Sequence, residues 1–444
     1  MLAIGLVLFT MVAIALSVHF LIGMTWTVAF VLGAILAPTD PVAAQAVFRR
    51  LGVPGRVGTI IEGESLVNDG TGLVAYRIAV AAVVTGTFSL WDAILDFLLV
   101  SGGGLLVGLL LGWVVLPLWA RVRDPSIFIA LSLLTAYAVY VLAEEVLHVS
   151  GVLAVVSYGL YRGWRDPRIF PDASTRMRNI SFWGVLIFLL ESMLFVLIGQ
   201  QLPSILDGLG EYRTSEVVLY GVLVYATLMV ARVAWFFIVP SLNPVIDRLL
   251  RNRYMQSPWQ ERLLMSWSGM RGAVSLAAAL AVPVSTNGGS PFPERDLIVF
   301  LTFFAILATL VLQGLTLGPL ISALRFKSEG EAVKVEELET RLEGARAALD
   351  RLERLDGEGV PQSAQERMRE QYEERIRRYE AGIEAGGTTD EYAESSAAWR
   401  AWRRELIKAE REAILSKRDR GEIGPEAMRR VMRDLDLEDS RVDG

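Results

Sequence analysis

Three carboxylates fall within about thirty residues near the start of the chain, inside long apolar runs. Asp40 stands between two prolines, and Glu64 and Asp69 belong to the string EGESLVNDG. A carboxylate at bilayer depth costs about 2.5–3.5 kcal/mol on insertion scales, so such a residue marks a functional site by default. Carboxylate oxygens suit hard cations and also take up protons. Asp40 and Asp69 are therefore predicted to bind a monovalent cation, Na⁺ or Li⁺, or a proton in competition with it.

The two segments should position these groups differently. Proline cannot donate a backbone hydrogen bond inside a helix, so the helix around Asp40 is predicted to break and to release carbonyl groups near mid-membrane. Broken helices of this kind form the ion sites of many secondary transporters. The second segment is predicted to be one continuous helix. In that helix Ser65 and Asp69 lie one turn apart on one face, and Glu64 and Asn68 lie on the adjacent face.

A buried arginine accompanies the carboxylates. Arg271 lies in a later apolar run between Gly269 and Gly272, and a guanidinium at this depth needs a partner. We predict that it pairs with Glu64, with Asn68 as a hydrogen-bonding neighbour. These three residues are predicted to support the site without ligating the cation.

Four other charged residues are weaker candidates. Glu191 is predicted to be buried, either in the ion pathway or in helix packing, and Glu62 is predicted to line the entry funnel. Arg232 is a candidate for a second brace between helices, and Arg77 is expected to snorkel or to pair.

Composition limits the class of protein. Hydrophobic residues make up 53% of the chain and charged residues 21%, and apolar runs of about 20 residues indicate a helical membrane protein. The sequence has no cysteine and two distant histidines, which excludes a disulfide framework and argues against a metal cluster. It lacks a Walker loop and a TVGYG filter, which argues against an ATP-driven pump and a channel. No nucleic-acid partner is expected.

The predicted fold class is all-α, a polytopic membrane protein of about ten spans. The spans are approximately Leu2–Phe20, Thr25–Phe48, Val57–Val84, Trp91–Trp119, Pro125–Val146, Gly151–Arg162, Ile180–Leu202, Glu216–Pro240, Glu261–Pro283 and Asp296–Leu324. Arginines gather after the even-numbered spans, and the intervening loops are poor in them. This alternation predicts that both termini face the cytoplasm. The apolar spans are expected to be surrounded by membrane lipid.

Two domains are predicted, a transmembrane domain of residues 1–325 and a cytoplasmic tail of residues 326–444. The tail is rich in Glu, Arg and Ala with apolar residues at helical spacing, which predicts a helical hairpin or bundle. Loops are expected at Asp356–Pro361 and Gly382–Thr389, and a last helix near Trp399–Arg418. The tail is either a solvated helical segment or a regulatory or dimer-supporting one.

Three motifs carry a family resemblance: APTDPVA at residues 37–43, EGESLVNDG at 62–70 and GMRGAVSLA at 269–277. Together they resemble the signatures of the monovalent cation:proton antiporter family, in its sodium/proton exchanger branch. The resemblance covers residues 1 to about 327 and implies an inverted-repeat fold with broken crossing helices. Family members usually have twelve or thirteen spans, so we expect this chain to lack the first two or three.

The resemblance also implies roles. The Thr39 carbonyl and the Ser65 hydroxyl would complete the cation shell of Asp40 and Asp69. Members with Asn-Asp at the place of Asn68-Asp69 are generally electroneutral, and asparagine carries no exchangeable proton.

The expected function is Na⁺(Li⁺)/H⁺ antiport across the plasma membrane by alternating access. The protein is expected to be a secondary active transporter and not an enzyme, to use no cofactor beyond the transported ions, and to form a homodimer. A K⁺/H⁺ antiporter of the same fold and a non-transporting sensor or channel built from a truncated transporter remain as alternatives.

Overall fold

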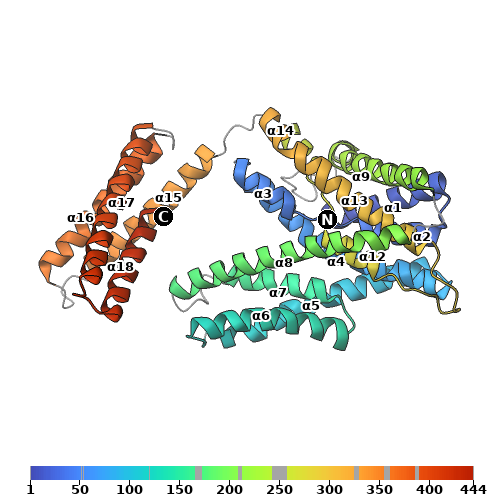
Figure 1. Ribbon diagram of the computed structural model, residues 1–444, viewed down its shortest axis with the longest axis horizontal. Coiled ribbons are helices and arrows are strands. Elements are labelled where there is room, and N and C mark those ends of the chain that lie inside the picture. The colour runs from blue at the N-terminus through green and yellow to red at the C-terminus, as the bar shows by residue number, and fades with distance from the viewer. Residues whose placement is uncertain are drawn as a thin grey trace. The chain divides into compact units, whose positions relative to one another are not determined.

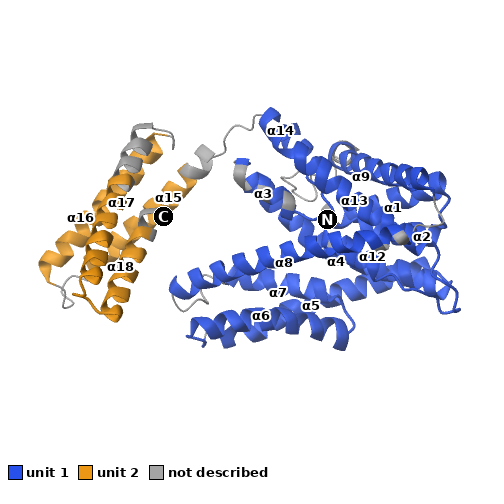
Figure 2. Ribbon diagram, in the orientation of Figure 1, with its two compact units in different colours: residues 1–326 blue, residues 327–444 orange. Residues whose placement is uncertain are grey.

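The computed structural model describes residues 2–51, 53, 55–119, 121–165, 173–208, 213–242, 258–324, 330–354, 361–385 and 390–443. The chain divides into two compact units, residues 1–326 and 327–444 (Figure 2). The arginine-rich segment 243–257, residues 356–360 of the first predicted tail loop and residues 386–389 of the second lie outside the described residues. Residues 382–384, predicted as part of the second loop, end a helix instead.

The first unit is built from long helices, as its apolar runs predict. They are α1 (Leu2–Ile22), α2 (Trp26–Leu36), α3 (Val42–Leu51), α4 (Gly55–Thr85), α5 (Leu90–Trp119), α6 (Pro125–Val141) with the π-helix η1 (Leu142–Val146), α7 (Gly151–Arg165), α8 (Ala173–Asp207), α9 (Thr214–Leu242), α11 (Trp259–Trp267), α12 (Ala273–Leu280), α13 (Arg295–Ala308), the π-helix η4 (Thr309–Gln313) and α14 (Gly314–Leu324).

Among the described residues, seven helical stretches are long and apolar enough to cross a membrane. They correspond to seven of the ten predicted spans. The other three predicted spans are α7, which has 15 residues, and the two interrupted pairs α2/α3 and α11/α12. The predicted all-helical polytopic fold is therefore confirmed.

Both interrupted helices break at the predicted motifs. The first break covers residues 37–41 and the second residues 268–272. The two breaks touch each other, because the Asp40 N–H donates to the Met270 carbonyl at 2.8 Å. Each break thus supplies a partner for a backbone group that a continuous helix would have satisfied internally.

Helices α5–α8 form one group and the remaining helices of this unit form another (Figure 1). Glycines allow α5 to pack directly on α7: a Cβ added at Gly104 would lie 2.5 Å from the Ser150 carbonyl oxygen, and one at Gly108 would lie 2.0 Å from the Ser157 hydroxyl. Such small-residue stripes let membrane helices approach closely. Helix α8 contacts α6 on one side and α12 and α13 on the other, so it borders both groups.

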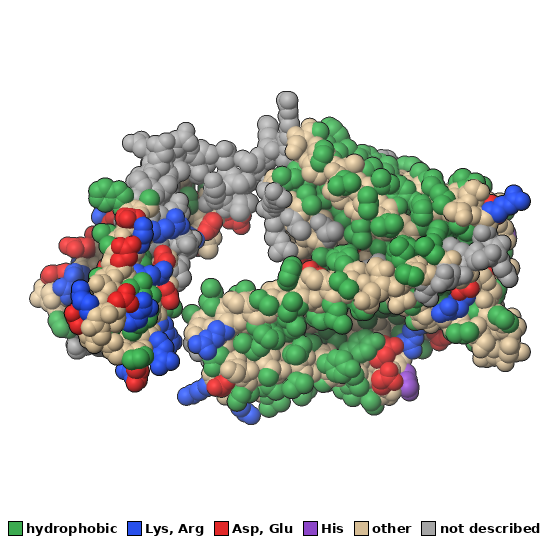
Figure 3. Space-filling view, in the orientation of Figure 1, with side chains coloured by type: hydrophobic (Ala, Val, Ile, Leu, Met, Phe, Trp, Pro, Cys, Tyr) green, Lys and Arg blue, Asp and Glu red, His purple; other side chains and the backbone are tan. Residues whose placement is uncertain are grey.

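The second unit consists of α15 (Gly330–Arg354), α16 (Gln362–Glu384), α17 (Asp390–Asp419) and α18 (Pro425–Asp443). Helices α15 and α16 pair around Leu342, Ala345 and Tyr379. The predicted last helix lies within α17, and α18 was not predicted. Charged side chains of both signs cover the visible face of this unit, whereas hydrophobic side chains cover the first (Figure 3).

Candidate ion-binding site

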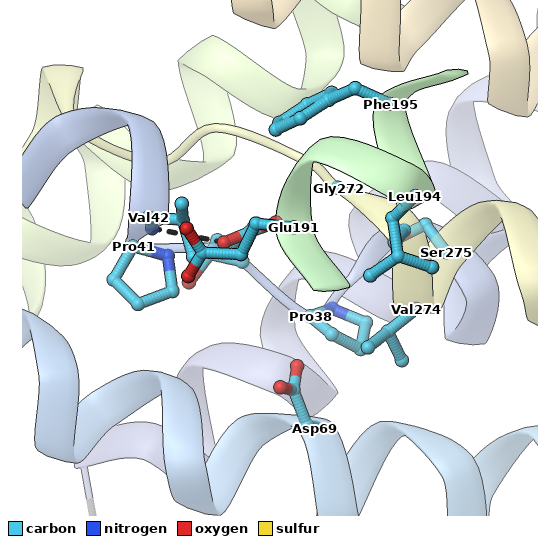
Figure 4. Close-up of a pocket in the computed structure, with 13 residues that line it drawn as sticks. Pro38, Pro41, Val42, Asp69, Glu191, Leu194, Phe195, Gly272, Val274 and Ser275 are labelled. Atoms are coloured by element: carbon cyan, nitrogen blue, oxygen red, sulfur yellow. Dashed lines mark hydrogen bonds between the residues drawn. The ribbon is translucent and has the colours of Figure 1, made fainter. Parts of the chain in front are cut away.

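A cavity of about 230 Å³ lies where the two broken helices meet. Its walls come from the first break, from Asp69 of α4, from the start of α12 and from α8. The lining residues are Pro38, Thr39, Asp40, Pro41, Val42, Asp69, Glu191, Leu194, Phe195, Gly272, Ala273, Val274 and Ser275. In Figure 4, Asp69 projects from its helix toward Pro38, and Glu191 projects from α8 toward Pro41 and Val42. Three carboxylates therefore face one cavity.

Asp40 is fixed at both its backbone and its side chain. Its N–H donates to Met270, and its Oδ1 accepts the N–H of Val42 at 3.0 Å (Figure 4). The second contact caps the first turn of α3, where the helix dipole also favours a negative charge. The other carboxylate oxygen lies against Gly272, because a Cβ there would be only 1.8 Å from Oδ2. Close approach of the second break to this carboxylate therefore requires glycine at position 272.

Thr39 joins the first break to α4. Its carbonyl oxygen accepts the Ser65 hydroxyl at 2.8 Å, and its own hydroxyl oxygen accepts the side-chain N–H of Asn68 at 2.7 Å. All three side chains are buried. The Thr39 carbonyl oxygen has a second lone pair, and the Ser65 hydroxyl oxygen keeps its own lone pairs while its proton points at that carbonyl. Both oxygens therefore remain able to face an ion. The structure thus brings Thr39 and Ser65 together beside the cavity that Asp40 and Asp69 line.

The predicted pairing of Arg271 with Glu64 is wrong. Glu64 pairs instead with Arg232 of α9, with 3.0 Å between Oε1 and Nη1, and both side chains are at most 8% exposed. The Nε of Arg232 also donates to the Met265 carbonyl of α11 at 3.1 Å. Arg232, predicted as a second brace, therefore joins α4, α9 and α11.

Arg271 bonds to backbone carbonyls, which explains the error. Its Nε donates to the Leu36 carbonyl at 3.0 Å, and its Nη1 donates to the Gly269 carbonyl. In a continuous helix the Leu36 carbonyl would accept the N–H of residue 40. Because Asp40 donates to Met270 instead, the Leu36 carbonyl is left available for the guanidinium. Asn68, predicted as a neighbour of the ion pair, bonds to Thr39.

The remaining candidates are placed as follows. Glu191 lines the central cavity. Glu62 is exposed and lines a separate cavity of about 280 Å³ between α3 and α4, together with Gln45 and Thr59. Arg77 forms an ion pair with Glu144, at 2.7 Å, which connects α4 to the π-helix η1. The sequence did not predict a role for Met270, and it marked Gly272 only as a neighbour of Arg271. Met270 acts through its backbone carbonyl, and Gly272 acts by letting the backbone approach Asp40. Neither role depends on a side chain, so neither is visible in the sequence.

The chain has known relatives. The model of the family described as "Sodium/hydrogen exchanger, transmembrane" matches residues 1–323. The chain belongs to the sodium/hydrogen exchanger family. It is 35% identical to the protein named "Uncharacterized Na(+)/H(+) exchanger Rv2287" of Mycobacterium tuberculosis, over 100% of this chain and 81% of that protein. It is 30% identical to the "Sodium, potassium, lithium and rubidium/H(+) antiporter" of Bacillus subtilis, over 98% of this chain and 64% of that protein.

A solved structure shares the fold. The sodium proton antiporter MjNhaP1 of Methanocaldococcus jannaschii superposes with a TM-score of 0.59 at 24% identity, over 73% of this chain and 77% of that one. The family is one of cation/proton exchangers, so this member of it is a multi-pass membrane transporter rather than an enzyme. The recognition made from the three motifs is confirmed.

Proposed function

We propose that the protein exchanges Na⁺ or Li⁺ for H⁺ across the plasma membrane by alternating access. Asp40 and Asp69 bind the cation and the proton in turn, and the Thr39 carbonyl and the Ser65 hydroxyl complete the shell. The observation that carries the proposal is that these two carboxylates line one cavity at the meeting point of two broken helices. Oxygen donors alone, two of them anionic, match a hard monovalent cation.

Competition at this site accounts for exchange. A cation and a proton neutralise the same carboxylates, so the site holds one or the other and reorients only when loaded. Asn68 adds no proton, because its amide does not titrate and already donates to Thr39. The net charge of the loaded site is then equal in both directions, which predicts electroneutral exchange.

Supporting residues hold this geometry. The Glu64–Arg232 pair and the Arg271 contacts with Leu36 and Gly269 brace the crossing. Glu191 belongs to the pathway as a third carboxylate of the cavity, and Glu62 lines the entry funnel.

The membrane topology and assembly also belong to the proposal. Both termini face the cytoplasm, as the arginine distribution indicates, and two copies form a homodimer in the lipid bilayer. Because the chain has no cysteine, one cysteine introduced into α17 reports the side of the tail by its labelling in intact cells. Cross-linking in native membranes reports the dimer.

Potassium is the second candidate substrate. The Bacillus subtilis relative supports this candidate, because its name includes potassium beside sodium, lithium and rubidium. Proteoliposomes with an imposed pH gradient distinguish the cations when Na⁺, Li⁺ and K⁺ are added in turn. Absence of flux with all three would favour the non-transporting alternative.

Neutralising the carboxylates tests the site. Asp40→Asn and Asp69→Asn should each abolish exchange, because each removes a charge needed by the cation and by the proton. Both variants should still insert, since a neutral side chain crosses the bilayer more easily. Asp92→Asn, at an exposed position in the first turn of α5, is the matched control. Full exchange by either site variant would remove that residue from the site.

The membrane potential tests the stoichiometry. An uncompensated charge would couple the cycle to about 2.3 kcal/mol per 100 mV. The potential is set by valinomycin and K⁺. In one-for-one exchange, net flux should stop when the Na⁺ concentration ratio across the membrane equals the H⁺ ratio, whatever the potential. A stopping point that moves with potential would rule out electroneutral exchange and would point to Glu191 as a second proton carrier.

A further inference from the structure

One peptide group connects the candidate site to a helix that contributes no residue to the cavity. The carbonyl of the Met270–Arg271 peptide accepts the N–H of Asp40 at 2.8 Å, and the N–H of the same peptide donates to the hydroxyl oxygen of Thr309 at 3.1 Å. Met270, Arg271 and Thr309 are all at most 1% exposed. The peptide therefore lies between Asp40 and Thr309, and both its C=O and its N–H are hydrogen-bonded.

The hydroxyl of Thr309 has a fixed direction. It donates its proton to the Ile306 carbonyl at 3.0 Å, so toward Arg271 it can only accept. Thr309 is the first residue of the π-helix η4, and π-turns inside α-helices occur frequently at functional sites. The contact is therefore a directed hydrogen bond from the second break to η4.

We propose that Thr309 is a positioning residue for the cation-binding carboxylate of Asp40. A peptide unit is planar, with its C=O and N–H on opposite sides, so its rotation moves both groups together. Without the Thr309 hydroxyl, the buried N–H of Arg271 has lost its acceptor, which costs free energy. The peptide can lower this cost by rotating until the N–H finds another acceptor. Turning withdraws the Met270 carbonyl from Asp40 and loosens the carboxylate. This inference rests on the proposed role of Asp40.

The test compares two substitutions at one position. Thr309→Val keeps the shape and removes the hydroxyl, and Thr309→Ser keeps the hydroxyl. In proteoliposomes, the valine variant should raise the apparent KM for Na⁺ about fivefold or more, because the cation loses a fixed ligand. The serine variant should stay within about twofold of the wild type. A role in stability alone would lower the melting temperature and leave KM unchanged.

The helix that directly precedes η4 offers a matched control. Thr302 is also fully buried in α13, and within the described part of the chain its hydroxyl has no hydrogen-bond partner. Thr302→Val therefore makes the same chemical change without removing an acceptor, and KM should not change.

Three results would overturn the proposal: a valine variant with wild-type KM, a serine variant as weak as the valine one, or an equal rise in KM for Thr302→Val. If the valine variant fails to accumulate in membranes, Thr309→Cys replaces it, because sulfur is a weaker acceptor; an unchanged KM then overturns the proposal. Failure of the proposed function gives a different result, since exchange would survive Asp40→Asn.

Discussion

Replacing Gly272 by alanine tests how tightly the second break presses on the candidate site. An added Cβ would lie 1.8 Å from Oδ2 of Asp40, 2.6 Å from its Cγ and 2.7 Å from its Cβ, whereas ordinary contact begins at 3.4 Å. The backbone at Gly272 is extended, with φ −138° and ψ −153°, which alanine also adopts. The conflict is therefore between the new methyl group and the carboxylate.

Asp40 must move by more than 1 Å to admit that methyl group. Its backbone is held by Met270 and its side chain by Val42, so the movement breaks at least one of these contacts. Overpacking of this kind costs about 1–3 kcal/mol of stability. A displacement of about 1 Å at a reacting group lowers turnover by about 100-fold. We expect Gly272→Ala to insert and to lose about 99% of its exchange activity.

Sodium-driven collapse of a pH gradient in proteoliposomes measures this loss, with the melting temperature measured in detergent. Gly63→Ala is the control: Gly63 lies in α4 beside Glu64, and nothing stands within 4 Å of its added Cβ. That variant should transport normally. A Gly272→Ala protein with wild-type rate and KM would show that cation binding does not depend on the observed position of Asp40.

Two further predictions concern buried charge. Arg232→Ala should destabilise the protein by about 3–5 kcal/mol, because it leaves Glu64 buried and unpaired; the double variant Arg232→Gln, Glu64→Gln should recover part of the loss, and a melting temperature no higher than that of Arg232→Ala would exclude the pairing. At the start of α13, burial raises the pKa of Glu294 above its usual value of 4.5. The stability gained from its protonated form is complete below that value and is lost as pH rises through the folded pKa. Glu294→Gln should therefore melt above the wild type at alkaline pH and equal it at acid pH, and a constant difference would exclude burial as the cause.

The sequence by itself determined the helical class, most span boundaries and three carboxylates that line the cavity, Asp40, Asp69 and Glu191. Apolar runs identify spans because the bilayer requires about 20 such residues. The prolines around Asp40 predict the first break because they lack a backbone donor. Helical spacing alone places Ser65 and Asp69 on one face of α4. These inferences depend only on local geometry and on the cost of burying charge.

The tertiary structure decided which groups satisfy one another. The sequence predicted Glu64 as the partner of Arg271, and the prolines predicted that carbonyls are released near Asp40, but no pattern of side chains shows which group binds those carbonyls. Arg271 takes those carbonyls, and Glu64 is left to Arg232. Likewise, the contacts of the Met270–Arg271 peptide with Asp40 and Thr309 exist only because two distant breaks cross. Backbone polar groups are identical in every residue except proline, so their partners emerge only when the chain is folded.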